Sequence, residues 1–253
     1  MHLTKFSSFA QETKTILCFG IDPKTPDFEM FYGITDKLIE EQQISAIKPN
    51  YAYFAQYGFD GLNALKQLVE RYHNRIPIIL DGKRGDIGKS SEAYANEIYD
   101  IWNADATTVS PYMGEDSVKP FLRDGRIVYL LCRTSNSGAS DFQELKIGKK
   151  YLYEIVAEKA VQWKCGLVVG ATSDAIKRIV KITKNKTPLL IPGIGAQGGD
   201  LEMVLKAIKD NIAIHRINAS SSLAYAYEKY GGTASEAALK EAKKLNETIK
   251  NYF

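Results

Sequence analysis

The sequence predicts an α/β fold, a (β/α)₈ (TIM) barrel with an extra helix at each terminus. Eight short apolar, β-rich segments recur along the chain, and segments of helical periodicity or composition separate them. Strands that alternate with helices imply βαβ units and a parallel sheet. Eight such units in 253 residues favour a closed barrel over an open doubly wound sheet. No low-complexity linker or change in composition divides the chain, so we expect residues 1–253 to form a single domain.

The expected elements alternate along the chain. The eight predicted strands are Thr15–Asp22, Ala46–Asn50, Pro77–Lys83, Asp105–Ser110, Arg126–Thr134, Lys164–Thr172, Pro188–Gly195 and Ala213–Ser220. The helices predicted between them include Phe31–Gln43, Phe54–His73, Ser90–Trp102, Lys149–Trp163, Ser173–Lys184 and Gly199–Lys209. Two further segments, Met1–Thr13 and Ala234–Tyr252, are expected to form the terminal helices outside the repeat.

The composition excludes several classes of protein. Hydrophobic residues make up 45% of the chain and charged residues 25%, which is ordinary for a globular protein. The net charge of +3, without a basic run or interleaved aromatic residues, gives no support for nucleic-acid binding. No apolar stretch approaches the ~20 residues of a membrane span, and the N-terminus lacks the apolar core of an export signal. We expect a cytoplasmic protein that binds neither nucleic acid nor membrane.

Cysteine and histidine patterns give little support for metal or triad chemistry. The three cysteines lie in or beside predicted strands and have no CxxC spacing, which is typical of buried thiols in a reducing compartment. The three histidines are scattered, without an HxxxH or HExxH pattern. The sequence therefore predicts no metal site, and a Ser–His–Asp or Cys–His enzyme is poorly supported.

The most informative segment is Leu80–Ile87, which reads LDGKRGDI after an apolar run. Side chains alternate between the faces of a strand, so Asp81 and Lys83 are expected on the same side, with Asp86 just beyond. Burying such charges costs several kcal/mol per ion unless they are paired. This pattern favours a functional site, and a strand-end salt bridge is the alternative interpretation.

Polar residues recur where the active site of a barrel enzyme lies, at the carboxyl ends of the strands. Charged groups at three consecutive strand ends are expected to converge on one mouth. The predicted strand ends carry Asp22, Lys48 with Asn50, Asp81 with Lys83, Ser110, Thr134 with Ser135 and Asn136, Gly193 with Gly195, and Asn218 with Ser220.

A glycine-rich segment, Pro192–Gly199, reads PGIGAQGG and contains a formal G-x-G-x-x-G. A lone match of this kind is weak evidence for a dinucleotide site. In barrels, the loops after the seventh and eighth strands commonly hold a substrate phosphate. Gly195 lets backbone N–H groups approach the anion and Gln197 donates a further hydrogen bond in this interpretation; a plain glycine turn is the alternative.

The segment Arg133–Asp141, RTSNSGASD, opens the longest connection from a strand to a helix. Small polar residues and glycine there predict a mobile lid over the mouth. Within it, Thr134–Asn136 are able to hydrogen-bond a heterocycle. An ordinary surface loop is the alternative.

Five motifs, in family order, resemble those of orotidine 5′-phosphate decarboxylases, specifically the second bacterial subfamily. They are Phe19–Pro23 (FGIDP), Ile47–Asn50 (IKPN), Leu80–Gly88 (LDGKRGDIG) followed by Ala93–Ala95 (AYA), Leu130–Asn136 (LLCRTSN) and Pro192–Asp200 (PGIGAQGGD). The resemblance runs from the first predicted strand to the seventh. It implies a carboxy-lyase that converts orotidine 5′-phosphate to UMP in pyrimidine biosynthesis, with no metal or organic cofactor.

The resemblance also implies roles for individual residues. Lys48, Asp81, Lys83 and Asp86 match the charge network of the family, with Lys83 as the proton donor to C6 of the pyrimidine. Asp86 is expected to reach the site of a partner subunit, which implies a homodimer. The implied substrate-binding positions are Asp22, Asn50, Ile87, Ser90, Thr134, Ser135, Pro192, Gly195, Gln197, Ser220 and Ser221.

One position departs from the family. Ser221 stands where the family usually has an arginine that pairs with the substrate phosphate. Serine hydroxyls bind phosphate without the bidentate charge of a guanidinium. Arg216 is nearby in sequence but falls within a predicted strand.

Two alternative functions follow from the same residues. A Mg²⁺-dependent sugar-phosphate lyase or aldolase of the same barrel superfamily shares the D-x-K-x-x-D pattern, and Ser221 makes a non-catalytic nucleotide-binding barrel conceivable. The Thr134–Asn136 segment and the Asp86–Ile87 pair favour the decarboxylase over the lyase. The presence of all four charged network residues argues against a protein without catalytic activity.

Overall fold

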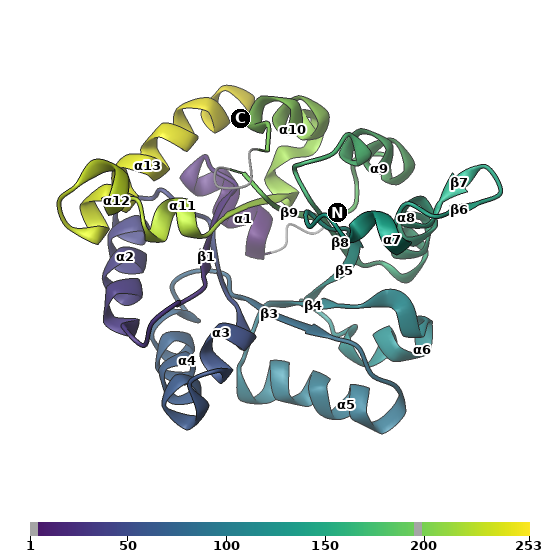
Figure 1. Ribbon diagram of the computed structural model, residues 1–253, viewed down its shortest axis with the longest axis horizontal. Coiled ribbons are helices and arrows are strands. Elements are labelled where there is room, and N and C mark those ends of the chain that lie inside the picture. The colour runs from purple at the N-terminus through teal and green to yellow at the C-terminus, as the bar shows by residue number, and fades with distance from the viewer. Residues whose placement is uncertain (1–4, 195–198) are drawn as a thin grey trace.

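The computed structural model describes residues 5–194 and 199–253 and confirms the barrel (Figure 1). In these residues the barrel strands are β1 (Leu17–Ile21), β2 (Ala46–Pro49), β3 (Ile79–Arg84), β4 (Ala106–Val109), β5 (Ile127–Arg133), β8 (Gly166–Val169), β9 (Leu189–Pro192) and β10 (Arg216–Ala219). They pair in parallel in the order β2-β1-β10-β9-β8-β5-β4-β3. Bridges Ile47↔Ile78 and Asn50↔Asp81 join the two outermost strands and close the ring. All eight predicted strands are present.

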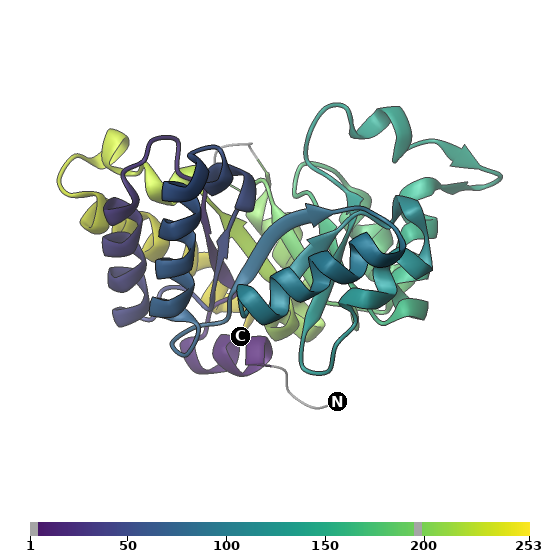
Figure 2. The same ribbon diagram turned by 90° about the horizontal axis from the view of Figure 1, so that it is seen from below.

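Helices cover the strands around the outside of the ring and at both of its ends (Figures 1 and 2). They are α1 (Lys5–Thr13), α2 (Phe28–Glu40), α3 (Tyr51–Ala55), α4 (Gly58–Tyr72), α5 (Gly88–Asn96), α6 (Glu115–Val118), α7 (Ala139–Phe142), α8 (Leu152–Trp163), α9 (Ala175–Thr183), α10 (Leu201–Ile208), α11 (Ser221–Ala224), α12 (Tyr227–Tyr230) and α13 (Ala234–Ile249). A π-helical turn, Glu97–Ile101, continues α5. Short 3₁₀ turns span Pro111–Met113, Lys119–Phe121, Lys209–Ile214 and Lys250–Tyr252.

Two predicted helices differ from the structure. The single helix expected over Phe54–His73 is divided into α3 and α4, because Gly58 has a left-handed φ of +61°. The expected helix Lys149–Trp163 starts only at Leu152. Residues before it form a two-stranded hairpin, β6 (Lys146–Ile147) and β7 (Lys150–Tyr151), which projects outward from the barrel (Figure 1).

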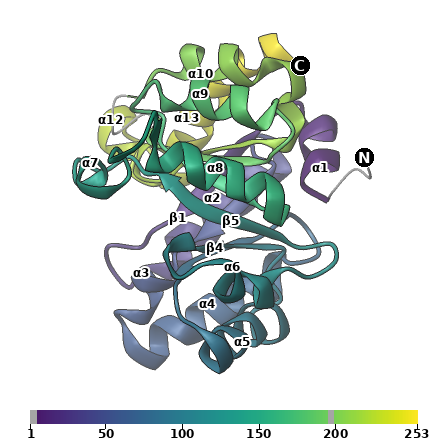
Figure 3. The same ribbon diagram turned by 90° about the vertical axis from the view of Figure 1, so that its right-hand side faces the viewer.

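The terminal helices occupy different places. Helix α1 lies across one end of the barrel, whereas α7 and α12 lie at the opposite end (Figures 2 and 3). Phe6 of α1 joins the cluster of apolar side chains inside the barrel, and Lys5 of α1 is ion-paired with Asp105 at 2.9 Å. Helix α13 is fixed to the barrel by Asn246, which accepts a hydrogen bond from Thr15 and donates one to the carbonyl of Gln43.

Arg216 belongs to the end of the barrel that α1 covers. It is fully buried on β10 and donates hydrogen bonds to the backbone carbonyls of Phe6, Ala213 and His215. Its guanidinium also lies 5.3 Å from the centre of the Phe6 ring. Burial lowers the pKa of Arg216 to about 10. The side chain therefore serves the closed end of the barrel and does not reach the mouth.

His215, beside it, is buried as the neutral imidazole. Its Nδ1 accepts from the Leu189 backbone N–H at 3.1 Å, so Nε2 carries the proton toward Asn185 Oδ1, 2.9 Å away. Burial, together with the charge of Arg216, lowers the pKa of His215 to about 3. As the pH falls, His215 therefore becomes a charged imidazolium at a higher pH in the unfolded chain than in the folded chain.

We predict that His215 makes the fold less stable as the pH falls below about 6.5, the pKa of an unfolded histidine. The loss grows by up to about 1.4 kcal/mol per pH unit, because the folded state cannot bind the proton. Urea unfolding of the wild type and His215→Gln measures it. The stability advantage of the wild type should shrink by about 2 kcal/mol between about pH 7.5 and pH 5. A difference independent of pH would contradict the assignment.

Candidate active site

A cavity of about 600 Å³, lined by both polar and apolar residues, opens at the carboxyl ends of the barrel strands. Its volume lies in the range of small-molecule sites. Residues on or after all eight barrel strands line it. The cavity therefore occupies the place where barrel enzymes bind their substrates.

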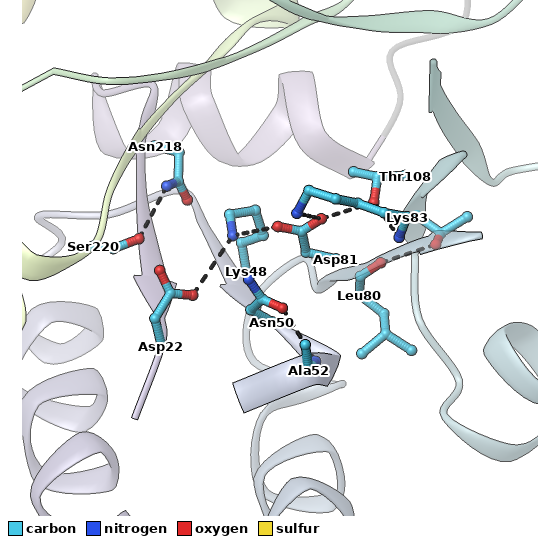
Figure 4. A network of polar contacts seen from close by, with 11 residues as sticks. Asp22, Lys48, Asn50, Ala52, Leu80, Asp81, Lys83, Thr108, Asn218 and Ser220 are labelled. Atoms are coloured by element: carbon cyan, nitrogen blue, oxygen red, sulfur yellow. Dashed lines mark hydrogen bonds and ion pairs between the residues drawn. The ribbon is translucent and has the colours of Figure 1, made fainter. Parts of the chain in front are cut away.

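A chain of ion pairs crosses this cavity (Figure 4). Lys48 Nζ lies 2.9 Å from Asp81 Oδ2 and 3.9 Å from Asp22 Oδ1. Lys83 Nζ lies 2.8 Å from the other oxygen of Asp81, Oδ1. Asp81 is thus bound by two ammonium groups. Both Lys48 and Asp81 are buried, whereas the Lys83 side chain is half exposed to the cavity.

The surroundings of this chain keep its members charged. Burial by itself would raise the pKa of Asp81, but the charges of Lys48 and Lys83 outweigh it and hold the pKa below its ordinary value. Burial would likewise lower the pKa of Lys48, but Asp81 and Asp22 outweigh it and raise the pKa overall. At neutral pH the carboxylate of Asp81 and the ammonium of Lys48 are both ionised.

Lys83 owes its position to an irregular strand. The pairing of β3 with β4 shifts register between Leu80 and Arg84, and Lys83 has a left-handed φ of 44°. Thr108 on β4 fills the irregularity: its Oγ1 accepts from the Lys83 backbone N–H at 2.9 Å and donates to Asp81 Oδ1 at 2.8 Å. Strand alternation predicted that Asp81 and Lys83 lie together, and they do, but a bulge rather than a regular strand aims the lysine.

Arg84, the next residue, anchors the end of β3. Its guanidinium contacts both carboxylate oxygens of Glu97, at 2.9 and 2.8 Å. It lies 4.4 Å from the ring centre of Tyr51 and 4.5 Å from that of Tyr94. Trp102 donates a further hydrogen bond to Glu97 at 3.1 Å. These contacts hold the backbone that carries Lys83.

The opposite side of the cavity is formed by Asn218 on β10 and by Ser220, directly after that strand (Figure 4). Asn218 Nδ2 donates to Ser220 Oγ at 3.2 Å. A Cβ on Gly20 would lie 1.9 Å from Ser220 Oγ, so only glycine fits at this position of β1. Asn218 Oδ1 and Asp22 Oδ1 are buried and accept no hydrogen bond from the described residues. They are available to hydroxyl or amide donors of a ligand.

The segment after β5 is held by Gln143. The side chain of Gln143 accepts from the Thr134 backbone N–H at 2.8 Å and donates to Thr134 Oγ1 at 2.9 Å. Gly170 packs so closely against Ser135 that a Cβ there would lie 2.8 Å from its backbone. Thr134, Ser135 and Gln143 all line the cavity. The connection from β5 to α8 contains α7 and the β6–β7 hairpin. Its first residues are held in place by the contacts of Gln143 and Gly170.

Ten of the predicted site residues meet at this cavity. They are Asp22, Lys48, Asn50, Asp81, Lys83, Thr134, Ser135, Pro192, Ser220 and Ser221. Gly195 and Gln197 lie outside the described residues. Sequence reasoning missed Thr108, Gln143 and Tyr225, because a threonine, glutamine or tyrosine at these places carries no distinctive pattern.

Asp86, Ile87 and Ser90 do not line the cavity of their own chain. Asp86 Oδ1 accepts from the Ile87 backbone N–H at 2.8 Å. The side chain of Ile87 is 58% exposed, and Ser90 is exposed on the first turn of α5.

Residues 5–194 and 199–253 provide neither a metal-binding cluster nor a membrane-spanning helix. These residues contain no group of three or more His, Cys, Asp or Glu side chains placed to hold a metal ion. None of their helices is both long enough and apolar enough to cross a membrane.

The barrel fold is shared with proteins of known structure. Leishmania donovani OMP decarboxylase superposes with a TM-score of 0.82 and 35% identity, over 97% of this chain and 99% of that one. A putative orotidine-monophosphate-decarboxylase from Toxoplasma gondii gives a TM-score of 0.85 at 28% identity, over 98% and 96% of the two chains. The chain thus falls in a class of α/β-barrel decarboxylases.

Sequence comparison identifies the family. The family model "Orotidine 5'-phosphate decarboxylase / HUMPS family" matches residues 15–229. Orotidine 5'-phosphate decarboxylase of Azoarcus sp. (strain BH72) is 41% identical, over 97% of this chain and 99% of the relative. The chain belongs to the orotidine 5'-phosphate decarboxylase / HUMPS family.

Proposed function

We propose that the protein converts orotidine 5′-phosphate to UMP and CO₂ in cytoplasmic pyrimidine biosynthesis, without a cofactor. The observation that carries the proposal is the placement of Lys83. Its ammonium lies in the cavity at 2.8 Å from Asp81, and Asp81 is itself fixed by Lys48 and Thr108. The near-full-length similarity to curated decarboxylases supports the same reaction.

In the proposed reaction, the bond between C6 and the carboxylate carbon breaks and its electron pair stays on C6. The carbanion has no adjacent electron sink, so a preorganised ammonium is the group that stabilises it as it forms. Lys83 then transfers a proton from Nζ to C6, and CO₂ leaves. Because half of the Lys83 side chain is exposed, the neutral amine regains a proton from solvent.

The rest of the cavity provides for the remainder of the nucleotide. Asp22 and Lys48 are proposed to bind the ribose hydroxyls, with Asn50 near them and the partner's Ser90 also in contact with the ribose. Thr134 and Ser135 are proposed to hydrogen-bond the pyrimidine. Pro192, Gly195, Gln197, Ser220 and Ser221 are proposed to surround the phosphate. Binding energy from the distant phosphate contributes to catalysis at C6.

We also propose a homodimer in which Asp86, with Ile87 and Ser90, completes the site of the other subunit. All three lie outside the cavity of their own chain. The segment after β4 lies beside the end of β3, because the Ser110 backbone N–H donates a hydrogen bond to the Arg84 carbonyl at 2.7 Å. In this segment, Tyr112 is 81% exposed and Met113 is 48% exposed. Ile87, on the segment after β3, is exposed as well, and exposed apolar side chains of this kind are what a partner subunit covers.

We predict that the purified protein releases CO₂ from orotidine 5′-phosphate and that Lys83→Ala loses at least about 10³-fold in kcat, because both the charge and the proton are removed. Lys66→Ala is the matched control: Lys66 on α4 is paired with Glu70, its side chain is 67% exposed, and it does not line the cavity. The assay follows UMP formation with and without excess EDTA, and circular dichroism verifies folding.

Three results would count against this proposal. A folded Lys83→Ala variant with wild-type turnover would remove the lysine from the mechanism. Loss of wild-type activity in EDTA would favour the Mg²⁺-dependent lyase or aldolase. Nucleotide binding without CO₂ release would leave a non-catalytic barrel.

We predict that mixing inactive Lys83→Ala and Asp86→Ala subunits restores activity. Each heterodimer has one site with both defects and one with neither, so equal mixing gives about a quarter of the wild-type sites. Mixing Lys83→Ala with Lys48→Ala is the control, because both lysines serve the site of their own chain. If verified subunit exchange restores nothing in the first mixture, Asp86 does not act across the interface.

A further inference from the structure

The phosphate end of the proposed site lacks a cation on β10. The chain after that strand reads NASSSL from Asn218 to Leu223, and Arg216 is bound at the closed end of the barrel. A phosphate monoester carries more than one negative charge at neutral pH. Hydrogen bonds from neutral hydroxyls alone bind such a group less strongly than charge-assisted bonds do.

Lys24 lies beside this segment because their strands are neighbours. β1 pairs with β10 in parallel, with Phe19 opposite Ala219, so the residues that follow the two strands leave the barrel together. The Lys24 backbone N–H donates to the Tyr225 hydroxyl at 3.3 Å, and its ammonium lies 4.5 Å from the centre of that ring. Both residues line the cavity.

The ammonium of Lys24 has no ion-pair partner among the described residues and is therefore able to bind an anionic ligand. Three lysines line the cavity within the described residues, and Lys48 and Lys83 are both paired with Asp81. In the same part of the chain, no carboxylate lies within ion-pairing distance of Lys24, whose side chain is exposed. Its contact with a ring face is a weak interaction that a phosphate, with a full charge, readily replaces.

The surface on which Lys24 rests is fixed. The Tyr225 ring packs edge-on against Phe31 of α2 at 6.4 Å between centroids and against Tyr227 at 6.2 Å. Ser222, in the same segment, lines the cavity, and its buried hydroxyl has no hydrogen-bond partner among the described residues. A rigid aromatic support, an unpaired ammonium and an unsatisfied hydroxyl thus face one end of the cavity.

We infer that Lys24 supplies the positive charge that binds the substrate phosphate, with hydroxyl donors from Ser221 and Ser222. This inference rests on the proposed function, because it takes a nucleoside monophosphate as the ligand. Lys24 is a binding residue for the phosphate and makes no contact with the reacting carbon.

The test compares UMP with uridine, which lacks only the phosphate, by titration calorimetry on the full-length protein. Lys24→Met keeps the stem that packs on Tyr225 and should weaken UMP binding by roughly 10- to 100-fold. Uridine binding should not change, and Lys24→Arg should keep most of the UMP affinity. Lys240→Met is the matched control, because Lys240 also lies 4.5 Å over a tyrosine ring, that of Tyr230, outside the cavity.

Each outcome decides a separate point. An unchanged UMP affinity in Lys24→Met, or equal weakening of UMP and uridine, overturns the inference. The CO₂ assay on the wild type tests the proposed reaction independently of the binding measurements. If the protein binds UMP through Lys24 but releases no CO₂, the inference stands and the proposed reaction fails. If the wild type does not distinguish UMP from uridine, the phosphate site itself is contradicted.

Discussion

The ion pair between Lys48 and Asp81 is the constraint on which the site depends. The two side chains are buried and 2.9 Å apart, on β2 and β3. These strands meet where the barrel closes, through the bridges Ile47↔Ile78 and Asn50↔Asp81. Burying two charges is expensive, and apolar replacements of such pairs often stabilise proteins. A charged pair at the closing seam is therefore explained by the site and not by the stability of the fold.

The pair matters because it fixes Asp81, and Asp81 in turn fixes Lys83. Three donors bind the Asp81 carboxylate, from Lys48, Lys83 and Thr108. The ammonium of Lys83 is thus oriented by the fold, and no reorganisation is needed when negative charge develops nearby. Chemistry and stability are separated along the barrel axis: the linked charges of Lys48, Asp81 and Lys83 lie at the mouth, whereas α1 and Arg216 close the opposite end (Figure 3).

The periodic features of the fold were predictable from the sequence, and its irregular features were not. Short apolar segments separated by helical segments predicted all eight strands, because buried parallel strands are short and uniformly apolar. They did not give the bulge at Lys83, since strand alternation assumes regular pairing. The motif residues located the cavity, but Thr108 escaped notice because a threonine on a strand is common. Ile87 and Ser90 do not line that cavity, and the role predicted for them requires a second subunit.

A thermodynamic double-mutant cycle on Lys48→Met and Asp81→Leu tests the central claim most directly, with urea unfolding as the measurement. Each single variant removes the nearest partner of a buried charge, leaving Asp81 with Lys83 alone or Lys48 with Asp22 at 3.9 Å, so we expect each to lose up to about 3–5 kcal/mol of unfolding free energy. The double variant removes both charges, and we expect it to be inactive but within about 1 kcal/mol of the wild type or more stable. A double variant that loses the sum of the two single losses would show that the pair does not govern the site as described.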